Sequence, residues 1–166
     1  AEGRRTVAVD GDLAAANLAD ALGVDAFSGP TLHDVLADEA TLGDALVART
    51  RGLAVVPGDP SLERYASIDP TRFGPVLAAL AERFDAIVVD TGAGVSYEAL
   101  LPTILADGTI LVTSPDDGAV QNAGRTADLV RRTGGELRGL VVTRVDDSVD
   151  PEAIADRVGA DLLTTV

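Results

Sequence analysis

The feature that most constrains the fold is the regular alternation of short apolar runs with longer Ala/Leu-rich stretches. The short runs are rich in β-branched residues and predict strands at 6–9, 53–56, 86–89, 109–113, 139–143 and 161–166. The longer stretches predict helices at 14–22, 31–37, 41–49, 71–83, 96–105, 119–133 and 151–158. Such alternation indicates an α/β fold with a doubly wound, mainly parallel sheet. The strand runs are almost continuously apolar, which is typical of parallel strands covered on both faces.

Chain length and turn residues refine this prediction. At 166 residues, the chain is predicted to form a single domain, residues 1–166. Asp150 followed by Pro151 predicts a helix start, because Asp caps helices well and Pro fits the first helical position. Asp69 and Pro70 precede the helix predicted at 71–83 in the same way.

Carboxylates follow several of the predicted strands. Asp10 and Asp12 close the first strand, Asp59 follows the second and Asp90 follows the third. In open parallel sheets, ligands bind just outside the carboxyl ends of the strands, so these side chains are expected to converge. Converging carboxylates repel each other unless protons or a cation lie between them. Since Mg²⁺ prefers oxygen ligands, the pattern predicts a magnesium site at this edge.

The charge balance limits the possible partners. There are 27 acidic residues against 13 basic ones, all Arg, and the formal net charge is −14. This charge argues against non-specific binding to nucleic acid or to an anionic membrane surface. The Asp excess and the absence of Lys suggest a salt-rich cytoplasm and a halophilic, for example haloarchaeal, origin.

Other residue counts exclude some classes of site. The sequence has no Cys, which excludes disulfides and thiolate metal sites. Its one His, His33, lies on a predicted short helix and is interpreted as a packing or surface residue rather than a ligand. No apolar run approaches the roughly 20 residues that span a bilayer, so a soluble, cytoplasmic protein is expected.

Taken in chain order, several segments resemble the MinD/ParA family of P-loop ATPases, the class with a deviant Walker A loop. These segments are VAVDGDLAAANLADALGV, TLHDVLADEATLGDAL, GLAVVPGDPS, FDAIVVDTGAG, ADGTILVTSPDDGAVQNAGRTADLV and GGELRGLVVTRVD. The resemblance covers essentially all 166 residues. A receiver domain also has acidic residues after its first and third strands, but it needs a Lys after its fifth strand, and this sequence contains no Lys.

The resemblance implies roles for four residues near the first and third strands. Asp90 matches the Walker B carboxylate, which holds Mg²⁺ through a water. Asp10 matches an Asp close to the metal and phosphates, and Asp12 matches the Asp that orients the attacking water, which suits a reaction that depends on positioning. Asn17 matches an Asn at the nucleotide-dependent contact surface, with a plain helix-start role as the alternative.

The resemblance also implies nucleotide contacts. Gly92 and Gly94 would let the backbone approach a phosphate closely, or could be ordinary turn glycines. Thr143 and Arg144 match an Asn-Arg pair that lies against the adenine, and Thr departs from that pattern.

Partners are implied in the same way. Asn122 and Arg125 lie where the family carries dimer-contact and partner-contact residues, although a solvated helix face also explains them. The family forms a nucleotide-dependent homodimer and responds to a regulatory partner protein. Membrane contact would require a tail beyond Val166, and direct nucleic-acid binding is not expected, because no basic patch is visible.

The family's defining element does not occur in this sequence. That element is a glycine-rich loop with two Lys, which cradles the nucleotide phosphates and lies upstream of the segment that Ala1 matches. The resemblance therefore implies a truncated domain, incomplete at both ends. In the family, the strand before this loop lies beside the strand that ends at Asp90. Its loss would leave strand edges unpaired, so marginal stability or self-association is expected.

The resemblance implies an ATPase core for ATP-dependent spatial organisation, such as division-site placement, chromosome partitioning or polar positioning. Mg²⁺ and ATP are the family's cofactors, and the chain without the loop is expected to be inactive and to bind neither tightly. The alternative is a degenerate, non-hydrolysing relative that acts as a regulatory or scaffold protein.

Overall fold

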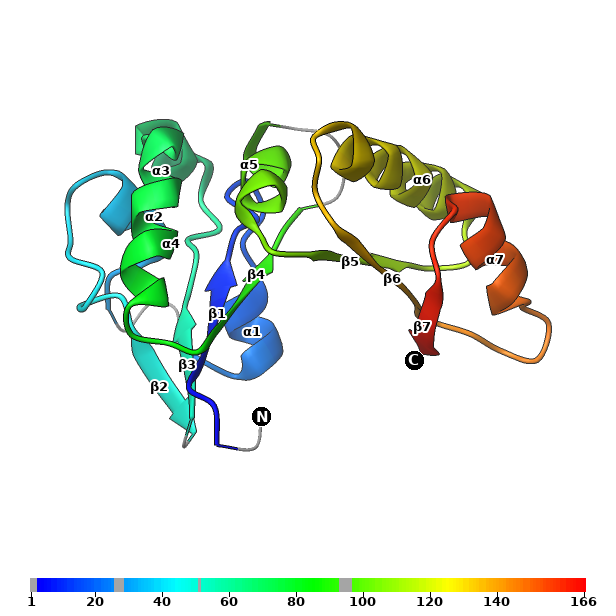
Figure 1. Ribbon diagram of the computed structural model, residues 1–166. Helices are drawn as coiled ribbons and strands as arrows, with labels where there is room; N and C mark the ends of the chain where they lie inside the picture. Colours follow the sequence, from blue (N-terminus) through cyan, green and yellow to red (C-terminus); the bar gives the residue numbers. More distant parts are fainter. Residues whose placement is uncertain (1–2, 26–28, 51, 93–96) are drawn as a thin grey trace. The chain divides into compact units, whose positions relative to one another are not determined.

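The computed structural model describes residues 3–25, 29–50, 52–92 and 97–166 (Figure 1). The chain forms two compact units, Ala1–Gly92 and Ala93–Val166. Each unit is an α/β structure with its own sheet. The single domain predicted over residues 1–166 remains a prediction.

The first unit is built on a four-stranded sheet. Its strands are β1 (Thr6–Asp10), β2 (Val47–Thr50), β3 (Leu53–Val56) and β4 (Ala86–Asp90), in the order β2-β3-β1-β4. The β1 strand pairs in parallel with both β3 and β4, whereas β2 and β3 are antiparallel. The parallel register places the ends of β1, β3 and β4 at one edge of the sheet.

Short helices connect and cover these strands. They are α1 (Leu18–Leu22), α2 (Leu32–Leu36), α3 (Leu62–Ser67), the 3₁₀ helix η1 (Pro70–Arg72) and α4 (Phe73–Ala81). Successive residues of a strand point to opposite faces, and both Val55 and Val56 of β3 are fully buried. The sheet is therefore covered on both faces at the end of β3, as predicted for parallel strands.

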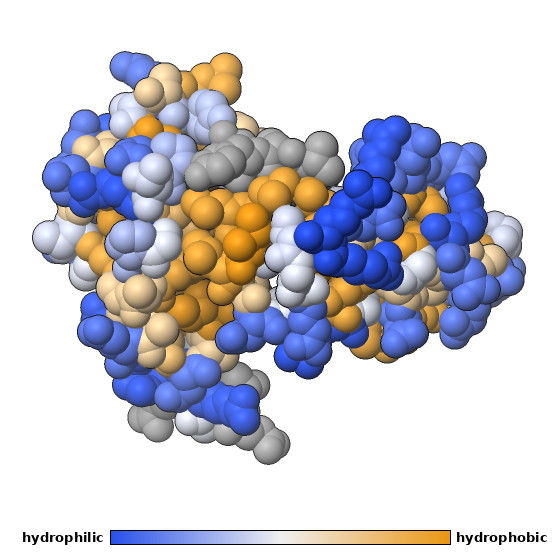
Figure 2. Space-filling model, turned by 45° about the horizontal axis from the view of Figure 1, so that its top comes forward, coloured by the Kyte–Doolittle hydropathy of each residue, from blue (hydrophilic) through white to orange (hydrophobic). Residues whose placement is uncertain are grey.

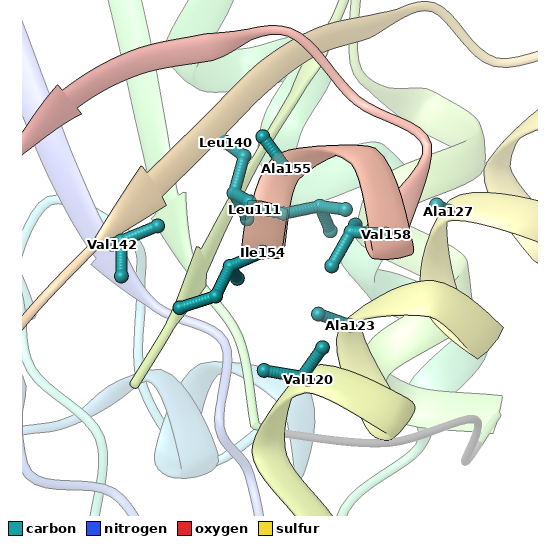
Figure 3. Close-up of a cluster of buried hydrophobic side chains, with 9 residues drawn as sticks. All are labelled: Leu111, Val120, Ala123, Ala127, Leu140, Val142, Ile154, Ala155 and Val158. Carbon is teal, nitrogen blue, oxygen red and sulfur yellow. The ribbon is translucent and has the colours of Figure 1, made fainter. Parts of the chain in front are cut away.

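The second unit has a parallel three-stranded sheet, in the order β5-β6-β7. Its elements are α5 (Tyr97–Leu105), β5 (Thr109–Thr113), α6 (Asp117–Arg132), β6 (Leu137–Val142), α7 (Pro151–Val158) and β7 (Leu162–Thr165). Side chains from β5, β6, α6 and α7 form one apolar cluster, which includes Leu111, Leu140 and Ile154 (Figure 3). The α7 helix begins as predicted, because the Asp150 carboxylate accepts hydrogen bonds from the backbone N–H groups of Glu152 and Ala153.

The other face of β5 is not covered. Leu111 and Thr113 are buried against the helices, whereas Ile110 and Val112 alternate with them and are 56% and 63% exposed. In the described chain, β5 pairs with β6 alone and β4 pairs with β1 alone. Val88 of β4 is also 58% exposed. The prediction of strands covered on both faces is therefore wrong for β5. Apolar side chains also gather on the face of the molecule that Figure 2 shows.

All six predicted strands are present, and the α/β fold with a mainly parallel sheet is confirmed. The helix predicted at 41–49 is wrong, because Val47–Thr50 forms β2 and pairs with β3. The α3 helix was not predicted. Asp69 caps η1, which leads into α4, so the predicted start near residue 71 is correct within two residues. No helix in the described ranges is long and apolar enough to cross a bilayer.

Candidate functional site

Asp10 is the most unusual polar residue in the first unit. It ends β1 and is only 1% exposed. Its Oδ2 accepts a hydrogen bond of 2.9 Å from the backbone N–H of Leu18, at the start of α1. Its Oδ1 is buried and has no hydrogen-bond partner. A buried carboxylate oxygen without a partner is costly, so this atom is poised to bind a proton or a cation.

Asp90 lies directly beside Asp10. The two residues are paired in the parallel register of β1 and β4, and the backbone N–H of Gly11 donates a 2.6 Å hydrogen bond to the Asp90 carbonyl. Asp12 follows on the loop after β1, where its Oδ1 accepts from the N–H of Ala15 at 3.1 Å. The structure therefore brings all three predicted carboxylates to one end of the sheet.

The carboxyl groups at this end of the sheet affect one another. Burial raises the pKa of the Asp10 carboxyl, the hydrogen bond from the Leu18 N–H lowers it, and the charge of Asp90 raises it further. The pKa of the Asp90 carboxyl is also raised, first by burial and then by the charge of Asp12. A raised pKa means that the ionised carboxylates are less stable in the folded protein than they are in water. A bound cation would stabilise them.

These residues fit Mg²⁺ as partial ligands. The unpaired Oδ1 of Asp10 and the adjacent carboxylate of Asp90 are hard oxygen donors of the kind Mg²⁺ prefers. No group of three or more His, Cys, Asp or Glu side chains in the described ranges is placed to hold a metal ion together, so Asp12 is not counted as a third ligand. Waters and phosphate oxygens would therefore have to supply the remaining ligands, as they commonly do for Mg²⁺.

Three glycines allow the backbone to pack tightly around the carboxylates. A Cβ on Gly11 would lie 2.6 Å from Val89 Cγ1, and one on Gly58 would lie 3.1 Å from Asp10 Cγ. A Cβ on Gly92 would lie 2.9 Å from Asp12 Oδ1. The space at Gly92 is thus occupied by the Asp12 side chain, which gives this glycine a packing role at the site.

Asn17 lies at the entrance to α1. Its backbone carbonyl accepts from the N–H of Ala21, and its side-chain amide donates to the Ala15 carbonyl at 3.2 Å. The side chain does not cap the helix and is exposed. Asn17 therefore both begins the helix and presents an amide at the surface, so the two sequence interpretations are compatible.

Comparison with known proteins identifies relatives. No protein-family model matches the chain. It is 31% identical over 145 residues to an uncharacterised ATP-binding protein of Methanocaldococcus jannaschii, covering 87% of this chain and 54% of that protein. It is 30% identical over 145 residues to the septum site-determining protein MinD of Synechocystis, covering 86% of this chain and 54% of that protein.

Solved structures decide the family. MinD of Pyrococcus furiosus, a cell division ATPase, has a TM-score of 0.88 and 33% identity, covering 99% of this chain and 71% of that one. MinD of Pyrococcus horikoshii, solved with Mg-ADP, has a TM-score of 0.87 and 32% identity, covering 99% and 69%. The chain belongs to the MinD/ParA family. It spans about half the length of the curated relatives it matches.

The remaining MinD/ParA site residues predicted from the sequence lie in the second unit or outside the described residues. Thr143 follows β6, and its backbone N–H and hydroxyl both donate to the Thr113 carbonyl, at 2.8 and 3.1 Å. Arg144 is exposed and has a positive φ of 57°. Gly94 lies outside the described residues. The Asn122 and Arg125 side chains lie on an exposed face of α6, as either interpretation of them requires.

The sequence analysis assigned no role at the site to two residues of the first unit, Gly58 and His33. Gly58 packs against Asp10, and His33 is fully buried with both ring nitrogens bonded to main-chain atoms. The Pro-Gly-Asp run after the second predicted strand was a signal for Gly58, because it lies at the same sheet edge as Asp10. No comparable signal existed for His33, whose partners are 20 and 26 residues away in the sequence.

Proposed function

We propose that this chain is the core of a MinD/ParA-like ATPase that organises cellular components in space by an ATP-dependent cycle. The curated relatives include MinD proteins and the antiactivator FleN of Pseudomonas aeruginosa, which supports a broad role in spatial organisation. Division-site placement, chromosome partitioning and polar positioning are the specific roles within this proposal. A nucleotide-dependent homodimer, a regulatory partner protein and a cytoplasmic location belong to the same proposal.

One observation carries the proposal. Asp10 is buried with an unpaired carboxylate oxygen, beside Asp90 and at the carboxyl ends of parallel strands. A fold without a ligand at this place gains nothing from an unneutralised buried charge, since removing it from water is costly. Binding of a cation–phosphate group would offset this cost, and the carboxyl ends of the strands are where α/β sheets bind such groups.

The residues have distinct roles in the proposed reaction. Asp90 and Asp10 would hold Mg²⁺, which when bound neutralises charge on the phosphates. Asp12 accepts one hydrogen bond, at Oδ1, and remains half-exposed on its loop, so its other carboxylate oxygen can orient a water for attack. Gly92 keeps the Asp12 side chain close to the end of β4. Asn17, Thr143, Arg144 and Gly94 are the proposed contacts to the dimer partner and the nucleotide.

The 166 residues of this chain contain no Lys that could bind a phosphate, whereas the family's phosphate-binding loop carries two. We therefore predict that the 166-residue chain alone binds Mg-ATP more weakly than about 100 μM. Calorimetric titration measures this affinity, and tighter binding would show that the chain cradles the phosphates without Lys. A non-hydrolysing regulatory or scaffold protein is the corresponding alternative function.

ATP hydrolysis tests the proposed activity. The protein as its gene encodes it is assayed with Mg-ATP, next to Asp12→Asn and the control Asp161→Asn, an exposed residue of the second unit. Asp12→Asn should lower turnover by about 100-fold or more, the range for a group that positions or activates a nucleophile. The control should match the parent protein. No hydrolysis by the parent protein together with retained nucleotide binding would support the scaffold function instead.

A further inference from the structure

His33 is a fully buried residue whose two ring nitrogens bond to two different loops. It lies on α2 in the first unit and is 0% exposed. Its Nε2 lies 2.9 Å from the carbonyl oxygen of Leu13, on the loop after β1. Its Nδ1 accepts a hydrogen bond of 3.0 Å from the backbone N–H of Asp59, on the loop after β3.

The two hydrogen-bond partners determine which nitrogen of the His33 ring carries the proton. A backbone N–H can only donate, so Nδ1 must be an acceptor without a proton. A carbonyl oxygen can only accept, so Nε2 must carry the proton and donate it. The imidazole is thus neutral and in a single tautomer. It links one donor and one acceptor that are otherwise 46 residues apart in the chain, at positions 13 and 59.

Both loops lie next to the carboxylates. Leu13 directly follows Asp12, so the bond from Nε2 holds the Leu13–Ala14 peptide, one residue beyond Asp12. Asp59 directly follows Gly58, whose missing side chain leaves room for Asp10: a Cβ there would lie 3.1 Å from Asp10 Cγ. Movement of either loop would therefore change the surroundings of Asp12 or Asp10.

The α2 helix is well anchored for this purpose. Thr31 and Asp34 form a capping box, with the N–H of Thr31 at 2.7 Å from Asp34 Oδ2. The N–H of Leu32 donates to the Pro57 carbonyl at 2.7 Å, and Leu32 and Leu36 are fully buried. The bond from Leu32 already joins α2 to the loop after β3, so His33 adds a second hydrogen bond to that loop and connects it to the loop after β1.

We propose that His33 is a positioning residue that sets the geometry of Asp12 and Asp10 through these two main-chain hydrogen bonds. The bond from Nε2 to Leu13 acts on the loop that carries Asp12, and the bond to Nδ1 holds the loop that packs on Asp10. This inference rests on the proposed function, because it assigns His33 to the same site.

Two conservative variants separate the two bonds. Gln can place an amide N–H near the position of Nε2 and keep the bond to Leu13, whereas Asn can place an oxygen near the position of Nδ1 and keep the bond to Asp59. His33→Gln and His33→Asn each lose one hydrogen bond, so both should lower the melting temperature. A purely structural role for His33 predicts that the amides near the carboxylates exchange faster to the same extent in both variants.

The measurement is amide hydrogen exchange of the 166-residue chain without metal. The reporters are the N–H groups of Ala15 and Leu18, which donate to Asp12 and Asp10. In His33→Asn, which loses the bond to Leu13, the Ala15 N–H should exchange about tenfold faster than in the parent chain, and the Leu18 N–H should change less than about threefold. In His33→Gln, which loses the bond to Asp59, the Leu18 N–H should exchange about tenfold faster and the Ala15 N–H should change less than about threefold. The N–H of Thr143, bonded to Thr113 in the second unit, is the control and should be unchanged.

Equal acceleration of the Ala15 and Leu18 amides in both variants, or no acceleration in either, would overturn the proposal. If neither variant folds, the ring nitrogens of the parent chain are observed directly by NMR, and a proton on Nδ1 would contradict it. A parallel titration with Mn²⁺ should show weaker binding by about tenfold in His33→Gln alone, because that variant loses the bond that holds the loop packed on Asp10. If the parent chain binds no Mn²⁺, the proposed function fails, whereas the exchange data still decide the role of His33.

Discussion

The two units end their parallel strands in different ways. In the first unit, β1 and β4 end at the adjacent carboxylates of Asp10 and Asp90, and both have raised pKa values, caused first by burial and then by neighbouring charge. In the second unit, β5 ends at Thr113 and β6 leads into Thr143. The backbone N–H and the hydroxyl of Thr143 both donate to the Thr113 carbonyl, so these polar groups already have hydrogen-bond partners within the unit.

This difference shows what marks a site in a parallel sheet. Both sets of strand ends occupy the position where α/β proteins bind ligands. Only the first set keeps a buried polar atom without a partner. The candidate metal site therefore differs from the strand ends of the second unit by its buried carboxylate without a partner, and not by its position in the sheet alone.

The largest expected effect tests the apolar packing of the second unit. Leu111→Ala removes a side chain that is 6% exposed and lies in the cluster of β5, β6, α6 and α7. It should lower the free energy of unfolding by about 3 kcal/mol, from lost burial and the cavity left behind. The matched control is Ile110→Ala on the uncovered face of the same strand, which should cost less than about 1 kcal/mol. Urea denaturation measures both, and equal costs would show that both faces of β5 are buried in solution.

Tight backbone packing around the carboxylates gives the next effect. Gly11→Ala places a Cβ 2.6 Å from Val89 Cγ1 and 2.8 Å from the Asp90 carbonyl, so it should destabilise the chain by about 2 kcal/mol. Gly124→Ala in α6 meets nothing closer than 4.0 Å and should stabilise the chain by up to about 1 kcal/mol. Opposite signs in thermal unfolding would confirm the contrast between the units. A neutral Gly11→Ala would mean that the end of β1 is loosely packed.

The pH dependence of stability tests the raised pKa values. A carboxyl group whose pKa is higher in the folded state than its ordinary value of 3.8 contributes stability that is complete below pH 3.8. That contribution is lost as the pH rises through the folded-state pKa. Asp10→Asn and Asp90→Asn should therefore be more stable than the parent chain at pH 7, with the difference narrowing in acid. Denaturation midpoints from pH 3.5 to pH 7 measure this, and a destabilised Asp90→Asn at pH 7 would contradict it.

The smallest effect is expected at an exposed ion pair of the second unit. Arg157 and Asp117 lie 2.8 Å apart with side chains 55% and 89% exposed. Arg157→Gln should cost less than about 0.5 kcal/mol, and added salt should reduce the cost further because it screens exposed charges. A cost that persists in high salt would contradict this, because it would mean that Arg157 and Asp117 are shielded from water in solution.

The sequence predicted the strands well because buried parallel strands leave continuous apolar runs, as in Leu53–Val56. It failed at Val47–Thr50, where an Ala/Leu-rich stretch has a helical pattern, yet antiparallel pairing with β3 makes it a strand. It missed α3, which buries no residue and so has no apolar periodicity to detect.

Prediction of the site followed the same logic. Asp10, Asp12 and Asp90 could be found because strand ends of a parallel sheet meet at one edge. The role of His33 could not be found, since its hydrogen bonds go to main-chain atoms, which have no residue-specific signature in a sequence. The unpaired oxygen of Asp10 was also out of reach, because it depends on the three-dimensional packing of α1 and Gly58.

The central claim is that the carboxylates of Asp10 and Asp90, with Asp12 beside them, are the protein's share of a divalent cation site. The most direct measurement is titration of the ¹⁵N-labelled chain with Mn²⁺, which broadens the amide signals nearest to the bound ion. The signals of Gly11, Asp12 and Thr91 should broaden first, and they should recover on addition of excess Mg²⁺ and stay sharp in Asp10→Asn/Asp90→Asn. Broadening that is equally strong around the exposed carboxylates of Asp146 and Asp147, or that persists in the double variant, would contradict the claim.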